Sequence, residues 1–227
     1  MAKYQVPADV PDELIETFIQ NMDAATAGTG KMNLFACDQK IEHLNDDFYD
    51  GDNEIPLSSN DPAHLFEIGS RCYKEGTIGV LAGQLGLISH YARDYPDVPY
   101  LVKLNSKSHL IKTSQRDPIS QALWDMDDVM SLVHNGINVV GIGYTIYVGS
   151  EYEHEMMSEA AQFIRQAHEL GSSVLLTLIE LSADDVAAHR TPFCQRSNLA
   201  AEAWRQRIDD HLLLNGVLNG VENRKCE

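Results

Sequence analysis

The stretch Gly141–Glu153 reads GIGYTIYVGSEYE, and it decides which fold the chain is expected to adopt. It continues an apolar, β-branched run, Ile137–Val140, and becomes polar and glycine-containing at its end. A buried strand that runs into a loop has this pattern. Three acids then follow at alternate positions, Glu151, Glu153 and Glu155. Acids early in a helix suit the positive end of its dipole. We therefore expect one βα unit, with its loop at the carboxyl end of the strand, where parallel α/β folds place their sites.

Length, composition and charge limit the class of protein. A length of 227 residues favours one domain, and contents of 44% hydrophobic and 22% charged residues are typical of a soluble globular chain. The net charge of -17 argues against nucleic acid or an anionic membrane as the main partner, but not against a local basic pocket for a phosphorylated substrate. The 4 cysteines show no C-x-x-C spacing, so we expect reduced thiols in a cytoplasmic protein.

Further strands and helices alternate along the chain. Strands are expected at residues 32–38, 76–82, 99–105, 137–147 and 173–179. Helices are expected at residues 12–24, 62–75, 87–93, 119–134 and 151–170, with polar loops at 39–61 and before 118. This alternation predicts parallel βαβ units, arranged either as a (β/α)8 barrel or as an open doubly wound sheet. A G-x-G-x-x-G pattern does not follow the first strand, which lowers the weight of a dinucleotide-binding fold.

Four motifs that occur in order at the ends of these strands carry a resemblance. They are ACDQKIEH at Ala36–His43, GQLG at Gly83–Gly86, PYLVKLN at Pro99–Asn105 and GYTIYVGSE at Gly143–Glu151. Over about residues 30–176 the chain resembles the archaeal-type class I fructose-bisphosphate aldolase family. The resemblance implies an α/β fold of the (β/α)8 TIM-barrel class, of which strands 1–5 are present and strands 6–8 are not visible. It also implies a lysine Schiff base with a substrate ketone, and reversible aldol cleavage of a sugar phosphate such as fructose 1,6-bisphosphate, without a cofactor.

Candidate site residues lie at the strand ends, one of them assigned by the resemblance and the others by their positions on the expected strands. Asp38 occupies the position of a catalytic aspartate, which can relay protons or orient the carbinolamine hydroxyl. Lys103 lies near the end of the third strand, where it acts either as a surrogate Schiff-base amine or, as we favour, as a positioning or ion-pair residue. Tyr144 and Tyr147 have opposite strand parity, so at most one faces the barrel interior. Substrate contacts are expected from Gln84, Asn105, Tyr147, Gly149 and Ser150. A metal site is not expected.

The resemblance ends near residue 176. The family has a Trp-x-Tyr-Pro-Arg-Gly type motif after its fifth strand, whereas this chain reads LTLIELS at Leu176–Ser182. The family's Schiff-base lysine follows about thirty residues later, but after Lys112 this chain has only Lys225. A frameshifted or truncated reading of an aldolase gene explains this change, and so does a genuine replacement of the tail; we favour the first. We expect a partial barrel over residues 1–180 and a divergent, mainly helical tail over 181–227.

Two functions from different classes remain open. The first is a class I aldolase that acts on a phosphorylated sugar in the cytoplasm, in glycolysis and gluconeogenesis. The second is a non-catalytic remnant that binds or assembles. Because the matching lysine and tyrosine are absent, we expect little or no aldolase turnover from this 227-residue chain. We also expect a homo-oligomer, because an uncovered strand edge favours association.

Overall fold

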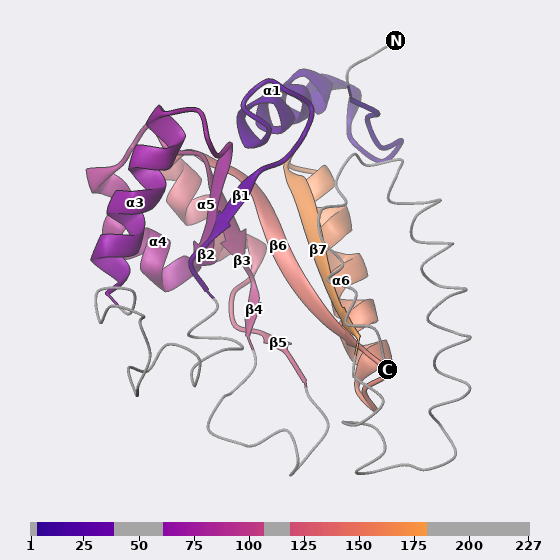
Figure 1. Ribbon diagram of the computed structural model, residues 1–227. Helices are drawn as coiled ribbons and strands as arrows, with labels where there is room; N and C mark the ends of the chain where they lie inside the picture. Colours follow the sequence, from indigo (N-terminus) through magenta and orange to yellow (C-terminus); the bar gives the residue numbers. More distant parts are fainter. Residues whose placement is uncertain (1–3, 39–60, 107–118, 181–227) are drawn as a thin grey trace, which may run out of the picture.

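The structure is a computed structural model that describes residues 4–38, 61–106 and 119–180, and of residues 175–180 only the backbone (Figure 1). The expected loops at 39–60 and 107–118 lie outside the described residues. So do the expected domain boundary near residue 180 and the helical tail beyond it.

Within the described residues, five strands form one parallel sheet in the order β1-β2-β3-β6-β7. The strands are β1 Leu34–Ala36, β2 Val80–Gln84, β3 Tyr100–Lys103, β6 Val139–Val148 and β7 Ser173–Glu180. Each strand joins the sheet beside the one before it, and the order does not reverse as it does in a doubly wound sheet. The expected set of five parallel strands is therefore confirmed, and the winding is that of a barrel.

The helices divide into one at the amino end of the sheet and four against one of its faces. The elements are η1 Asp12–Leu14, α1 Ile15–Ala25, α3 Pro62–Lys74, α4 Leu85–Tyr91, η3 Ala92–Asp94, α5 Met126–His134 and α6 Glu153–His168. Figure 1 shows α1 above the starts of β6 and β7, where Asn21 Nδ2 donates to the Gly171 carbonyl at 2.8 Å. The α3–α6 helices form the other layer.

Two apolar clusters show which face each strand residue occupies. Ala82 and Leu101 pack with residues of α1, whereas Val102 packs with residues of α3–α6. Parallel partners share a face, and the register pairs Ala82 with Leu101 and Gln84 with Lys103. Gln84 and Lys103 therefore lie on the face turned away from α3–α6, at the carboxyl end of the sheet.

Some element boundaries differ from the expectation. Gly83 and Gln84, expected in a loop, complete β2, and α4 begins directly after them. The helix expected from residue 119 begins only at Met126, because Asp125 forms a capping box there. Its carboxylate accepts from the amides of Asp127 and Asp128 at 2.9 and 3.0 Å, and the Asp128 carboxylate accepts from the Asp125 amide at 3.1 Å.

The residues before this helix form a short hairpin that the sequence pattern does not predict. Strand β4, Asn105–Ser106, pairs antiparallel with β5, Gln121–Ala122. Two residues per strand are too few to show the alternation by which strands are identified. The hairpin continues directly from β3, so it lies at the same edge of the sheet as Lys103.

Close packing between β6 and β7 gives the first testable prediction. A Cβ added to Gly141 would lie 2.7 Å from the Ser173 carbonyl oxygen, in the backbone of the neighbouring strand. We expect Gly141→Ala to lower the free energy of unfolding by roughly 1–3 kcal/mol, measured by urea denaturation. Gly86 in α4 is the control, since a Cβ there meets nothing within 4 Å and alanine favours a helix. Equal midpoints for Gly141→Ala and Gly86→Ala would contradict this description of the sheet.

Candidate active site

A buried ion pair joins the two residues expected to be catalytic. Lys103 Nζ lies 3.3 Å from Asp38 Oδ2, and the two residues are only 5% and 8% exposed. Asp38 follows β1 and Lys103 ends β3, so the pair reaches across β2, which lies between these strands. A charge buried alone is costly, whereas two opposite charges in contact offset part of that cost. The contact is an ion pair, while the roles expected for the two residues stay predictions.

Cys37 is the neighbour of Asp38 in sequence, but it belongs to the other face of the sheet. Its side chain is buried in the apolar cluster beneath α3–α6. Burial, together with the negative charge of Asp38, raises the pKa of the Cys37 thiol to about 12. The thiol is therefore neutral at ordinary pH, and the nucleophilic thiolate form is not populated there.

The amide of Asn105 holds the hairpin against β6. Its Nδ2 donates to the carbonyl oxygens of Ser120 and Thr145 at 2.8 and 2.7 Å, and its Oδ1 accepts from the Thr145 amide at 2.9 Å. An amide nitrogen has two hydrogens to donate, and both are used here. Asn105 is fully buried. The geometry therefore favours a positioning role for Asn105, while its expected contact with substrate stays a prediction.

Gln84 extends this network to β2. Its Nε2 donates to the Asn105 carbonyl at 3.1 Å, and its Oε1 accepts from Trp124 Nε1 at 3.2 Å. The structure thus brings Gln84 and Asn105 together, as it does Asp38 and Lys103. Gln84 is paired in register with Lys103. The two hydrogen bonds of its amide therefore fix the side chain that lies next to the buried ion pair.

The other expected substrate-binding residues form the turn from β6 into α6. Ser150 N donates to the Tyr147 carbonyl at 3.4 Å, and Tyr152 N donates to Ser150 Oγ at 3.2 Å. Gly149 has a φ of 91°, which favours glycine, and its amide donates to the Glu153 carboxylate at 2.5 Å. Glu153 thus lies in the first turn of α6, where an early acid was expected, and its carboxylate holds the turn that precedes the helix. The contacts of this turn with substrate stay a prediction.

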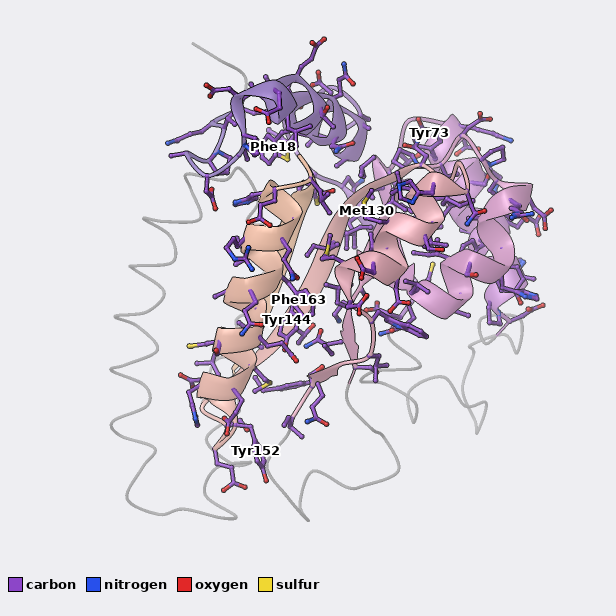
Figure 2. The ribbon with its side chains drawn as sticks, turned by 180° about the vertical axis from the view of Figure 1, so that it is seen from behind. Phe18, Tyr73, Met130, Tyr144, Tyr152 and Phe163 are labelled. Carbon is purple, nitrogen blue, oxygen red and sulfur yellow. The ribbon has the colours of Figure 1, made fainter. Side chains whose placement is uncertain are left out.

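Tyr144 lies on the helix-facing side of β6. Its ring packs against Phe163 of α6 with the centroids 5.8 Å apart, and Figure 2 shows the two side chains together between strand and helix. Its hydroxyl donates to the Glu159 carboxylate. Burial, then the hydrogen bond and negative charge of Glu159, raise the pKa of Tyr144. Tyr147 has the opposite strand parity, but it is also buried among the members of the apolar cluster that contains Tyr144.

Four residues of the polar network were not expected from sequence. Thr145 had a usable signal, since it lies two positions before Tyr147 and shares its strand parity. The other three residues are Ser120, Trp124 and Glu159. They join the network only because the hairpin brings segments that are distant in sequence together.

The described residues were also searched for two other kinds of feature. In residues 4–38, 61–106 and 119–180, His, Cys, Asp and Glu side chains form no group of three or more that is arranged to hold a metal ion. In the same part of the chain, none of the helices is long and apolar enough to cross a membrane.

Known proteins share this sequence and fold. A family model described as DeoC/LacD family aldolase matches residues 32–205, and so runs past residue 176, near which the resemblance was expected to end. The fructose-bisphosphate aldolase/6-deoxy-5-ketofructose 1-phosphate synthase of Methanocaldococcus jannaschii is 51% identical over 168 residues, which are 74% of this chain and 52% of that protein. The class 1 fructose-bisphosphate aldolase of Thermoproteus tenax is 30% identical over 141 residues, which are 62% and 46% of the two chains.

Solved structures agree with these relatives. A fructose-bisphosphate aldolase from Slackia heliotrinireducens matches with a TM-score of 0.73 and 51% identity, over 81% of this chain and 56% of that one. An archaeal fructose-1,6-bisphosphate aldolase, with its catalytic Lys covalently bound to the carbinolamine intermediate, matches with a TM-score of 0.53 and 27% identity, over 70% and 56%. The expected TIM-barrel class and the resemblance to class I aldolases are thereby confirmed.

The chain spans about half the length of the curated relatives that it matches. The family model nevertheless covers most of the chain, and the ordered parallel strands, with polar residues at their carboxyl ends, belong to the matched region. The chain therefore belongs to the DeoC/LacD aldolase family.

Proposed function

We propose that this chain carries the site of a Schiff-base aldolase, which binds a phosphorylated sugar such as fructose 1,6-bisphosphate for reversible aldol cleavage, and that this 227-residue chain itself gives little or no turnover. The observation that carries the proposal is the buried Lys103–Asp38 pair at the carboxyl end of the parallel sheet. Barrel enzymes place their catalytic groups at this end. The relatives named fructose-bisphosphate aldolase support the choice of substrate.

The chemistry requires an amine and a base. A lysine amine attacks the ketone carbon, and loss of water gives an iminium. The substrate hydroxyl next to the breaking bond then loses its proton, and the electrons of the carbon–carbon bond move to the iminium. We propose that the Asp38 carboxylate accepts or relays this proton. Because Lys103 Nζ lies 3.3 Å from Asp38 Oδ2, we propose that it orients Asp38 and does not attack the ketone.

Covalent trapping tests which amine, if any, this chain uses. Lys103 Nζ is paired with Asp38, and after Lys112 the sequence contains only Lys225. We therefore expect less than one adduct for every ten chains (roughly) when the protein is treated with dihydroxyacetone phosphate and borohydride, read by intact mass. A stoichiometric adduct would refute this expectation. Its loss in Lys103→Met, but not in the exposed control Lys74→Met, would reassign the amine to Lys103.

Binding of the sugar phosphate tests the proposed function without requiring turnover. We expect fructose 1,6-bisphosphate to bind the wild-type chain, and Asp38→Asn to weaken binding about tenfold, because a hydrogen bond to a carboxylate contributes roughly 1.5–3 kcal/mol. Isothermal titration calorimetry measures both dissociation constants, with Asp94→Asn, at an exposed position in η3, as the control. If neither fructose 1,6-bisphosphate nor dihydroxyacetone phosphate binds the wild-type chain, the proposed function is wrong.

We further propose that the protein works in the cytoplasm, in glycolysis and gluconeogenesis, and as a homo-oligomer. Cys37 and Cys72 are free thiols, which suits a reducing compartment. For the assembly, we expect light scattering after size exclusion to give a multiple of the mass of one chain. A single monomeric species at micromolar concentration would contradict it.

A further inference from the structure

The β4–β5 hairpin is held from two sides. On the side of the buried ion pair, Asn105 Nδ2 donates to the Ser120 carbonyl at 2.8 Å. On the helix side, the Ala122 amide donates to Glu159 Oε2 at 3.1 Å. The Tyr144 hydroxyl lies between, 3.4 Å from the Ser120 carbonyl and hydrogen-bonded to the same Glu159 oxygen. One carboxylate of α6 thus binds both the hairpin and the strand behind it.

Removing the Glu159 carboxylate would leave the donors that bind it without their acceptor. Tyr144 is fully buried, so its hydroxyl needs an acceptor inside the protein. Burial and the charge of Glu159 raise the pKa of Tyr144, and the hydroxyl therefore stays protonated and donates. Glu159 belongs to the middle of α6, which packs along β6, so its position is fixed by the helix.

The hairpin is in turn attached to the residue that follows Lys103. The amides of Leu123 and Trp124 donate to the Leu104 carbonyl at 2.8 and 3.3 Å, and the Leu104 amide donates to the Gly143 carbonyl at 2.9 Å. The Trp124 indole then donates to Gln84 at 3.2 Å. A shift of the hairpin would therefore move Leu104, the residue directly after Lys103. It would also break the hydrogen bond from the Trp124 indole to Gln84, the residue registered with Lys103.

We propose that Glu159 is a positioning residue for the candidate active site. Through Ala122 and Tyr144 it fixes the β4–β5 hairpin, and through Leu104 and Trp124 the hairpin fixes Lys103 and Gln84. Its effect on the sugar phosphate rests on the proposed function. Its effect on the hairpin does not, and the two are measured separately.

Hydrogen exchange tests the effect on the hairpin. Glu159→Ala keeps a good helix former but removes the acceptor, so we expect the Ala122 and Leu123 amides to exchange about tenfold faster or more. Glu159→Gln keeps an acceptor oxygen, and its exchange should stay within about threefold of wild type. Tyr144→Phe, which preserves the ring against Phe163 and removes one donor, should give an intermediate rise. Glu155→Gln, at an exposed position of the same helix, is the control and should change nothing.

Tryptophan emission gives a signature that reports on the active-site side. In a Trp204→Phe background, Trp124 is the single tryptophan of the chain. Glu159→Ala should shift its emission to longer wavelength, because the indole loses Gln84 and meets water, and Glu159→Gln should not. Unchanged exchange and unchanged emission in both Glu159→Ala and Tyr144→Phe would overturn the proposal.

Ligand binding completes the test. Glu159→Ala should weaken fructose 1,6-bisphosphate binding about tenfold, with Glu159→Gln restoring it to within about threefold. If exchange and emission change but the affinity does not, the positioning of the site is refuted. If the wild-type chain binds no sugar phosphate, the proposed function fails, and exchange and emission still decide whether Glu159 fixes the hairpin and Gln84.

Discussion

The candidate site depends on one buried contact, between the Lys103 ammonium and the Asp38 carboxylate. Removing two charges from water costs several kcal/mol for each, and their attraction offsets this only when the geometry is good. The geometry here is demanding, because the pair spans β1 and β3 while β2 lies between them. The side chains meet on the face turned away from α3–α6, where the register places Gln84 of β2 beside Lys103. The sheet must hold its register for the pair to form.

The two faces of the sheet stabilise this arrangement in different ways. The face beneath α3–α6 is an apolar core that packs the sheet against those helices. At the carboxyl edge, polar side chains tie one strand to the next: Gln84 from β2 to Asn105, and Asn105 from β4 to β6. Buried amides that are fully hydrogen-bonded make a unique arrangement rigid, whereas unpaired ones would destabilise it. The family's chemistry needs groups held in fixed positions, and this edge supplies them.

Local patterns predicted those features that local energetics decide. The apolar run before Gly149 gave strand β6, and Asp61 caps α3 as expected, accepting from the Ala63 amide at 3.0 Å. The predicted start of α5 at residue 119 was wrong, because the helix begins after Asp125, whose cap is completed by the acid three residues later, Asp128. The contact of Asp38 with Lys103 and the role of Glu159 depend on strand order and on a four-residue hairpin. Neither leaves a periodic signal in the sequence.

A double-mutant cycle on Lys103 and Asp38 measures the central contact most directly. The free energies of unfolding of the wild type, Lys103→Met, Asp38→Asn and the double variant are compared by urea denaturation. If the buried pair organises the edge of the sheet, each single variant leaves one buried polar group without its partner. The double variant should then lose less free energy of unfolding than the two single variants lose together. We predict a coupling free energy above about 1 kcal/mol. Costs that add to within about 0.5 kcal/mol would contradict the account.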